Sequence, residues 1–529
     1  MTVFRSITAC RWTFGLALSC VLVAQIAPTG DQRSSREAAR AVPAREGQSD
    51  PAADLTPALR QFVDVLSTVQ SQGADPKPID ALIYGGAIPS MLRELDPHTQ
   101  FFDPAQFQQL KEMEDSEQKG FGSIVSVLPG QVIFLQTLPG TPSNKAGIQA
   151  GDELVAVNNI AIRALESEQI IELLTEARQQ RVEIYIRRQG SARPLQFTLT
   201  PELVDAPSVD RAYMLQPGFG YIRIASWDLQ TAKQLSEAIT KLGGTSLTGL
   251  VLDLRSNPGG VVKAALDVSA MFLAPGQRIL TAKGRSSDAQ TADVPKDAKP
   301  YHFALAVLIN EKTASASEIF SGALQDHDRA VIVGLPSYGK GLVQSVLPLS
   351  DGTGLAITTA FYYTPSGRSI QHPLRDSALS ETFSDKPKAN APTYKTDRGR
   401  VVTGGGGIQP DIRVEGQATT RLETVLDASG VLTSFATSYI STHSPLPDSF
   451  EITAETLDEL KVYLSGRSIQ PSVAEWSAER AWVSKRLKEE IVTQAQGVAK
   501  GEEIQAKRDP QIQAALKAMR ESPLVAEAR

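Results

Sequence analysis

Residues 304–334 read ALAVLINEKTASASEIFSGALQDHDRAVIVG, and this stretch decides the fold. Two short apolar runs, at 304–310 and 330–334, enclose a segment with helical periodicity at 315–325. A strand, a helix and a second strand in this order predict an α/β unit in which the two strands run parallel. In such units a functional site is expected at the carboxyl ends of the strands.

The same alternation extends outward from about residue 218 to about 415. Apolar runs at 220–226 (GYIRIAS) and 249–255 (GLVLDLR) precede helical patterns near 231–242 and 262–273. This region therefore predicts an α/β layer with a largely parallel sheet.

The flanking segments have different patterns. Five β-like runs and one helical stretch (SEQIIELLTEAR, 167–178) between about 120 and 203 predict a compact, partly open barrel. Residues 55–95 show the periodicity of a helical hairpin. We expect a signal peptide or anchor at 1–27, a polar linker at 28–54, a helical region at 55–118, the barrel at 119–203, the α/β core at 204–415 and a charged helical region, for packing or oligomerisation, at 416–529.

Composition excludes several classes of function. The 529 residues are 41% apolar, which suffices for several hydrophobic cores, and the net charge of −6 with no long basic stripe argues against a nucleic-acid partner. Both cysteines, Cys10 and Cys20, lie near the amino terminus, so neither a thiol nucleophile nor a disulfide is expected downstream. The five histidines stand singly, with no HExxH, so no metal is expected.

The amino terminus predicts export. Arg5 and Arg11 precede an apolar stretch at 14–27, in the pattern of a signal peptide. We expect the periplasm or the outer face of the inner membrane, with cleavage after Ala24 or Ala27, or retention as an anchor. A buried core helix is the alternative, but the polar segment that follows offers it no packing partner. No second segment approaches the ~18 apolar residues that span a bilayer.

A serine nucleophile is predicted where the strand ending near Asn310 turns into a helix. Small residues there can expose the hydroxyl of Ser315 beside backbone N–H groups that have no intrahelical partner. Such amides can build an oxyanion hole, and the N–H of Ala316 is the first candidate. The alternative is that Ser315 and Glu318 form a capping box and do nothing else.

A lysine is the predicted base, because an alcohol needs one at neutral pH and no histidine constellation offers it. Lys340 lies between Gly339 and Gly341, where missing side chains leave room for a substrate or partner backbone to approach. As a base it must be neutral, so its pKa must fall from ~10.4 to roughly 7–8, which costs about 3–5 kcal/mol of stability. The alternative is an exposed turn lysine.

Gln344 is predicted to hold that amine. It lies four residues after Lys340 in what reads as a strand, so alternation places both on one face. An ordinary polar strand residue is the alternative.

A glycine-rich turn is predicted to bind a carboxylate. Gly120, Phe121, Gly122 and Ser123 precede the strand SIVSV (123–127). Successive N–H groups of such a turn can point at a carboxylate, and the strand can accept a peptide as an additional strand. This combination recognises a free carboxyl terminus, with an ordinary tight turn as the alternative.

Six segments carry a resemblance to a known family. They are LDPHTQFF (95–102), DLRSNPGG (253–260), TASASEIFSGALQDHDRA (313–330), SYGKGLVQ (337–344), YYTPSGRSIQ (362–371) and GIQPDI (407–412). Together with the barrel segment they resemble the carboxy-terminal processing peptidases, or tail-specific proteases. The resemblance implies a multidomain α/β fold: a ClpP/crotonase-like protease core, a PDZ-like β-barrel domain at 119–203, with SNKAGIQAGDELVAVNN (143–159) as its second signature, and flanking helical regions.

The resemblance also implies roles for individual residues. Ser315 is the nucleophile, Lys340 the general base and Gln344 its orienting residue in such enzymes. A backbone amide of the Asn-Pro-Gly-Gly turn completes the oxyanion hole, which implies Gly259 or Gly260 and leaves the choice open.

The implied function is a serine endopeptidase that cleaves exported proteins near their carboxyl termini without a cofactor. Its implied partners are protein tails, and an adaptor protein, the membrane through an anchor, and further copies of the chain are candidate partners. The alternatives are a catalytically silent PDZ scaffold and an α/β enzyme acting on thioesters. The chain departs from the family pattern in two regions, to which the sequence assigns no role: an insertion at about 372–406 and the region beyond 415.

Overall fold

The computed structural model describes residues 51–75, 77–114, 117–285, 288–372, 391–416, 419–447 and 449–521. The predicted signal peptide and its cleavage sites lie outside these ranges. Within them, no helix is both long enough and apolar enough to cross a membrane.

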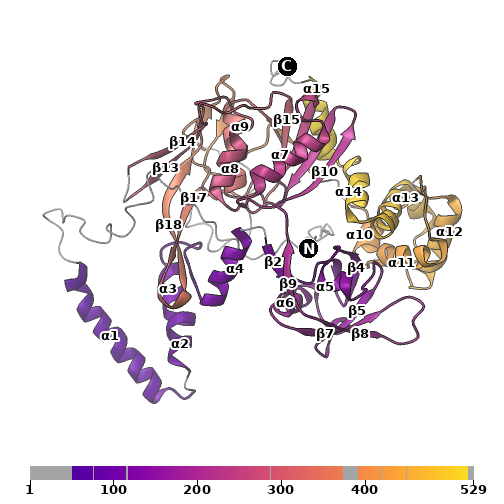
Figure 1. Ribbon diagram of the computed structural model, residues 1–529, viewed down its shortest axis with the longest axis horizontal. Coiled ribbons are helices and arrows are strands. Elements are labelled where there is room, and N and C mark those ends of the chain that lie inside the picture. Colours follow the sequence, from indigo (N-terminus) through magenta and orange to yellow (C-terminus); the bar gives the residue numbers. More distant parts are fainter. Residues whose placement is uncertain are drawn as a thin grey trace.

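The core is a six-stranded sheet in the order β10-β11-β12-β15-β16-β21 (Figure 1). The last five strands are parallel and β10 is an antiparallel edge, which confirms the predicted α/β layer. Central strands are buried on both faces, which explains their uninterrupted apolar sequences. The strands are β10 (Val209–Gln216), β11 (Phe219–Ile224), β12 (Gly249–Asp253), β15 (Ala304–Ile309), β16 (Val331–Gly334) and β21 (Ile412–Arg413).

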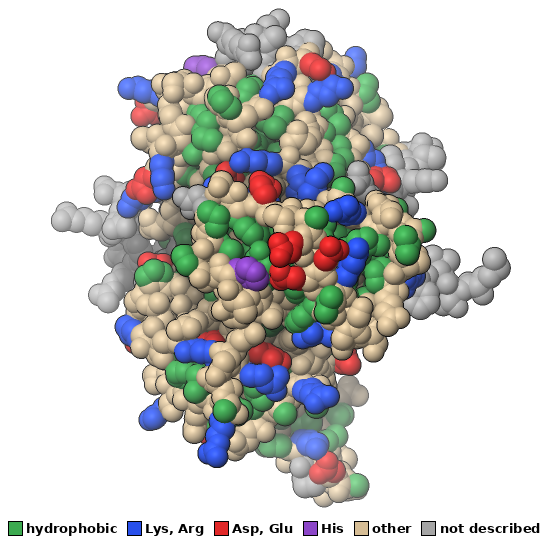
Figure 2. All heavy atoms as spheres, turned by 90° about the vertical axis from the view of Figure 1, so that its right-hand side faces the viewer, with side chains coloured by type: hydrophobic (Ala, Val, Ile, Leu, Met, Phe, Trp, Pro, Cys, Tyr) green, Lys and Arg blue, Asp and Glu red, His purple; other side chains and the backbone are tan. Residues whose placement is uncertain are grey.

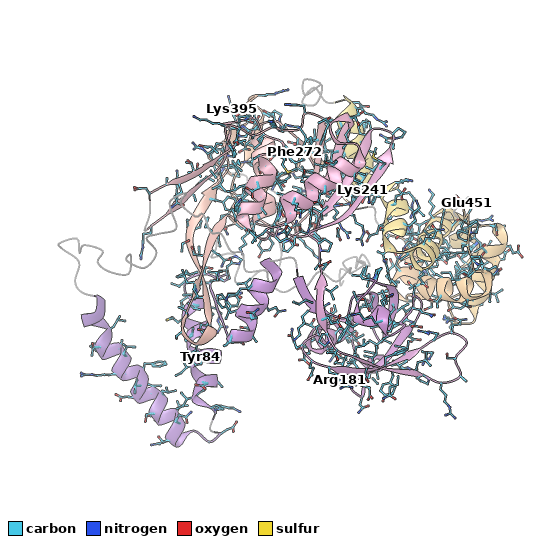
Figure 3. The ribbon with its side chains drawn as sticks, viewed as in Figure 1. Tyr84, Arg181, Lys241, Phe272, Lys395 and Glu451 are labelled. Carbon is cyan, nitrogen blue, oxygen red and sulfur yellow. The ribbon has the colours of Figure 1, made fainter. Side chains whose placement is uncertain are left out.

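Helices cover both faces of this sheet. One face packs against α7 (Thr231–Leu242), α8 (Val262–Ser269) and α9 (Ala316–Asp326), and every residue of α9 is buried. Phe272, just after α8, lies in this layer (Figure 3). The other face packs against α15 (Pro510–Glu521), at the far end of the chain.

A second sheet has the order β1-β18-β13-β14, with β17 paired to β18. Figure 1 shows the β17–β18 hairpin running from the core toward the amino-terminal helices. Strand β1 pairs with β18, so residues 100–102 join the sheet that carries the segment after Lys340. The strands are β1 (Gln100–Phe102), β13 (Arg278–Gly284), β14 (Gln290–Asp293), β17 (Leu342–Pro348) and β18 (Gly354–Tyr363).

The amino-terminal helices meet the tip of this hairpin. Phe107 packs against Phe102 and Ala356, and Tyr84, labelled in Figure 3, stacks on Phe101 at 5.5 Å between ring centroids. Helix α1 forms as predicted but stands apart from the rest (Figure 1), and none of its described side chains is buried. The helices are α1 (Pro51–Gln72), α2 (Ile79–Leu82), η1 (Ile83–Ala87), α3 (Ile88–Arg93) and α4 (Pro104–Glu114).

The β-rich unit is a sheet in the order β3-β4-β5-β7-β8, with β6 added to β5. Strand β3 is an edge, and α6 (Ser167–Ala177) is the predicted helix. A one-turn helix, α5 (Pro142–Lys145), was not predicted; it starts with a proline at its first position. The strands are β3 (Ser123–Leu128), β4 (Gln131–Thr137), β5 (Glu153–Val157), β6 (Ile160–Ala161), β7 (Val182–Arg187) and β8 (Leu195–Leu199), with β2 (Glu117–Gly120) paired to β9 (Glu202–Asp205) beside them.

The carboxyl-terminal helices contact both units. They have an apolar core of their own, α15 packs on the core sheet, and Gln131 of β4 donates to Ser434 Oγ at 3.3 Å. On the face in Figure 2, basic and acidic side chains are interspersed. The helices before α15 are α10 (Arg421–Ala428), α11 (Val431–His443), α12 (Ala454–Ser465), α13 (Val473–Gln496) and α14 (Val498–Ala506).

The described end of the insertion is a hairpin of β19 (Thr393–Lys395) and β20 (Val401–Thr403). It packs on the carboxyl end of α9, where Asp397 N–H donates to Asp326 O at 2.9 Å and Arg400 pairs with Asp328 at 2.6 Å. The insertion therefore supports the end of the helix that Ser315 begins.

Candidate active site

Ser315 lies in a strained turn at the start of α9. Its φ of 57° and ψ of −112° are rare for a residue with a side chain. Strained serines on sharp strand-to-helix turns are typical of nucleophiles, because the turn presents the hydroxyl clear of both elements. The neighbouring Ala314 N–H donates to Asn257 O at 3.0 Å, which places the Asn-Pro-Gly-Gly turn beside it.

The Ser315 hydroxyl is buried and makes no hydrogen bond with any described residue. Its backbone N–H donates to the Glu318 carboxylate at 2.7 Å, so the two residues have the arrangement of a capping box although the hydroxyl itself makes no hydrogen bond. A buried hydroxyl without a partner costs about 1–3 kcal/mol. Capping alone therefore does not account for a serine at this position.

Strain at Ser315 predicts the order of stability of two variants. Glycine adopts positive φ without a Cβ penalty and is also preferred over alanine at a helix N-cap, so Ser315→Gly should be more stable than Ser315→Ala by about 1–2 kcal/mol. Urea unfolding of both variants measures the difference, and a more stable alanine variant would contradict the strain.

Lys340 is buried, so the alternative of an exposed turn lysine is wrong. Its Nζ donates to Gln344 Oε1 at 2.8 Å, and Gln344 is itself fully buried. The prediction that Gly339 leaves room for a substrate or partner backbone is wrong. A Cβ on Gly339, whose φ is +87°, would lie 2.2 Å from the His372 ring, so this glycine makes room for the chain's own segment.

A base that takes the proton of Ser315 is expected within hydrogen-bonding reach of its hydroxyl, but Ser315 Oγ has no hydrogen-bond partner among the described residues, so its bond to Lys340 Nζ is not formed. The two residues are instead joined through their backbones. Glu318 Oε2 accepts from Ser315 N–H at 2.7 Å and from Lys340 N–H at 2.9 Å. The Tyr362 hydroxyl bridges the carbonyls of the same two residues, at 3.2 Å and 2.8 Å.

Glu318 is thus the centre of the site's backbone. Its other oxygen, Oε1, accepts from Gly339 N–H at 2.7 Å and from Ser337 Oγ at 2.5 Å. Burial raises the pKa of this carboxyl above its ordinary value, and the four hydrogen bonds offset the shift only in part.

The two candidate glycines for an oxyanion hole differ in geometry. Gly259 N–H donates to Asn257 Oδ1 at 2.9 Å, whereas Gly260 N–H finds no acceptor in the described part of the chain. Gly260 has φ +147° and lies against Trp227, whose carbonyl oxygen would be 2.0 Å from an added Cβ. Ala316 N–H, at the first position of α9, likewise donates to no described group.

His98 lies beside Lys340, and burial of its ring lowers its pKa from 6.5 to about 4; the Lys340 ammonium, when protonated, adds to the shift, and Asp96 opposes it. The neutral ring is therefore the form that the fold favours. Its backbone carbonyl accepts from Gln344 Nε2 at 2.6 Å.

The His98 pKa predicts a loss of stability in mild acid. The unfolded chain binds a proton near pH 6.5 and the folded ring near pH 4, so the free energy of unfolding falls as pH decreases through this window. The loss should be about 2 kcal/mol. Denaturation of the wild type and His98→Asn at pH 7 and pH 4.5 measures it; equal losses in both proteins would contradict the assignment.

The predicted tail-binding turn lies between β2, which ends at Gly120, and the edge strand β3. Gly122 has φ +71°, and a Cβ there would lie 2.3 Å from Thr141, so glycine is required. Ser123 Oγ donates to Ser143 Oγ at 2.6 Å, inside the second signature.

The roles of Glu318, Tyr362 and the 96–99 segment are not visible in the sequence pattern. Local pattern indicates Glu318 only as a cap, because its bonds to residues 337–340 exist only in the tertiary fold. In the 96–99 segment, Asp followed three residues later by Thr is a local signal for a turn. No three His, Cys, Asp or Glu side chains among the described residues are grouped to hold a metal ion.

Comparison with known proteins defines the chain's relatives. A family model described as peptidase family S41 matches residues 218–375, and a PDZ domain model matches 134–188, which leaves out the Gly120–Ser123 turn. A carboxy-terminal-processing protease of Bartonella bacilliformis is 34% identical over 323 residues, covering 59% of this chain and 72% of that protein. A carboxyl-terminal-processing protease of Synechocystis is 34% identical over 290 residues, covering 54% and 67%.

Among solved structures, a photosystem II D1 C-terminal processing protease is 26% identical, with a TM-score of 0.37 over 69% of this chain and 94% of that one. The α/β core and the PDZ domain, with these sequence matches, define a serine-type peptidase. The chain belongs to the carboxy-terminal-processing proteases of peptidase family S41. The predicted fold class and enzyme class are confirmed.

Proposed function

We propose that Ser315 attacks the scissile carbonyl of a protein substrate while neutral Lys340 takes its proton. Lys340 then delivers that proton to the leaving amine, and water hydrolyses the acyl-enzyme by the reverse sequence. Gln344 holds the amine through the 2.8 Å bond from Nζ to Oε1. The observation that carries the proposal is that Ser315 and Lys340 are both buried and that their backbone N–H groups donate to the same carboxylate, that of Glu318.

The oxyanion forms, on this proposal, between the N–H groups of Gly260 and Ala316. Both donors lack an acceptor among the described residues, whereas Gly259 N–H is occupied by Asn257. Donors that are already oriented and unpaired stabilise developing charge without reorganising. Gly260 is therefore favoured over Gly259.

The substrate tail binds, we propose, at the turn Gly120–Ser123 and along the edge of β3. The turn offers backbone N–H groups to the terminal carboxylate, and the free edge of β3 accepts the tail as an added strand. The relatives are named for processing at carboxyl termini, which agrees with capture of a free tail.

The test compares two peptides that differ only in having a free or an amidated carboxyl terminus. The wild type should bind and cleave the free form, and Ser315→Ala should bind it with similar affinity without cleaving it. Mass spectrometry locates the cut. Binding by the wild type with no cleavage would mean a silent scaffold, and equal cleavage of the amidated peptide would rule out recognition of the carboxylate.

Export of the protein is part of the proposal, as is the division of the chain into the regions 1–27, 28–54, 55–118, 119–203, 204–415 and 416–529. The apolar stretch 14–27, as signal peptide or membrane anchor, would place the enzyme in the periplasm or on the outer face of the inner membrane. An adaptor protein remains a proposed partner that no described contact identifies.

Self-association is proposed through α1. Its apolar residues Leu55, Leu59, Phe62, Leu66 and Val69 follow a 4-3-4-3 spacing, which suits a second helix, and four of them are exposed. Light scattering of the wild type against Leu59→Asp tests this; equal masses corresponding to a monomer would contradict it.

A further inference from the structure

Residues 96–99 form a turn built around one carboxylate. Asp96 Oδ1 accepts from His98 N–H at 2.7 Å and from Thr99 N–H at 2.9 Å, while Oδ2 accepts from Thr99 Oγ1 at 2.7 Å. Asp96 and Thr99 are buried. The turn directly precedes β1, whose pairing with β18 fixes it to the sheet. Its geometry is therefore set both by its own side chains and by the sheet.

This turn presents one backbone carbonyl to the catalytic region. His98 O accepts from Gln344 Nε2 at 2.6 Å, and the Oε1 of the same amide accepts from Lys340 Nζ at 2.8 Å. An amide has an acceptor on one end and donors on the other. Because the His98 carbonyl can only accept, it forces the NH₂ toward itself and the oxygen toward the lysine.

The opposite orientation would harm the site. A rotated Gln344 amide would set its oxygen against the His98 carbonyl, which is a repulsive contact. It would also point its NH₂ at the lysine amine, where it would repel the protonated form and occupy the lone pair of the neutral form. The orientation of Gln344 thus depends on where the His98 carbonyl points. That direction depends in turn on the Asp96 carboxylate. Burial alone would raise the pKa of Asp96, but hydrogen bonds from Thr99 and His98 lower it overall, so the carboxylate stays ionised as an acceptor.

We propose that Asp96 is a positioning residue for catalysis: it fixes the His98 carbonyl, which orients the Gln344 amide, which holds the amine of Lys340. The inference rests on the proposed function, in which Lys340 is the base. It adds a residue 244 positions earlier in the chain, from a segment that contributes no side chain to the dyad.

The test is a double-mutant cycle of Asp96→Ala and Gln344→Ala, with kcat and KM measured for peptide cleavage. Each single variant should lose about 10²-fold in kcat at unchanged KM, as expected for a misplaced catalytic group. If Asp96 acts through Gln344, the double variant should lose no more than the worse single variant. Multiplicative losses, near 10⁴-fold, would overturn the proposal.

Asp96→Asn serves where the alanine variant folds poorly, because asparagine keeps one acceptor oxygen for the two N–H groups. Its kcat should lie between the wild type and Asp96→Ala, and the same cycle with Gln344→Ala applies. A wild-type kcat in Asp96→Asn and in Asp96→Ala would also overturn the proposal.

Asp103→Ala is the matched control. Asp103 caps α4 in the same region, accepting from Gln106 N–H at 2.9 Å, and has no recorded bond to Gln344. It should lower the unfolding temperature without lowering kcat. If it lowered kcat as much as Asp96→Ala, general loosening would explain both. Activity of Ser315→Ala is measured separately, because the cycle does not test the nucleophile. Full activity of that variant would contradict the proposed function itself, whatever the outcome of the cycle.

Discussion

Lys340→Ala is expected to lower kcat by about 10⁴–10⁶-fold and to leave KM nearly unchanged. Removal of a nucleophile or its base from a serine peptidase has effects of this size, because the members act as one unit. Lys340 lies in the peptidase core, whereas the proposed tail-binding turn at 120–123 lies beside the edge strand β3 of the β-rich unit, so binding of the tail should persist. Initial rates on a free-tail peptide measure the loss.

Two companions sharpen this prediction. Lys340→Arg keeps a cation but cannot lose its proton at working pH, so it should be as inactive as the alanine variant. Lys312→Ala removes an exposed lysine of the loop before Ser315 and should retain wild-type kcat. An active arginine variant would show that the charge of residue 340, rather than its basicity, matters.

Glu318→Ala is expected to damage both stability and catalysis. It leaves three buried N–H groups and a hydroxyl without their acceptor, which should cost about 3–5 kcal/mol in the free energy of unfolding. It also removes one of the two links between the backbones of Ser315 and Lys340, the other being the Tyr362 hydroxyl, and a displacement of about 1 Å costs roughly 10²-fold in kcat. Urea unfolding and kcat measured on one preparation test both effects.

Glu318→Gln separates the two effects, because it keeps the volume and one acceptor oxygen. It should recover part of the stability and less of the activity, since one oxygen cannot serve all four donors. Glu311→Gln, at an exposed position in the same loop, is the control and should change neither quantity. Wild-type kcat in Glu318→Gln would mean that the carboxylate does not align the site.

The parallel core could be predicted because its strands are buried on both faces and read as uninterrupted apolar runs. Ser315 and Lys340 could be predicted because each has a local sequence signal: a serine before a helix start and a lysine between glycines. The contact between Gln344 and Lys340 exists as expected, but simple strand alternation does not explain it: β17 begins at Leu342, after Lys340, and its pairing with β18 shifts register between Val343 and Gln344.

The rest depends on contacts between distant segments. The choice between Gly259 and Gly260 is made by an Asn257 side chain that occupies one of the two amides. Gly339 is required because the ring of His372 lies against it. The sequence of α15 predicts a helix but does not show that this helix covers one face of the core sheet. The position of the Ser315 hydroxyl, without its expected bond to Lys340, also could not be foreseen.

Labelling with a fluorophosphonate, followed by peptide mapping, tests the central claim most directly. The reagent bonds to a serine only when that serine is activated as a nucleophile. The wild type should carry one label, on Ser315, and Lys340→Ala should remain unlabelled although it is folded and still has the serine. A label on another serine, or equal labelling of Ser315 in Lys340→Ala, would contradict a hydroxyl activated by a buried amine.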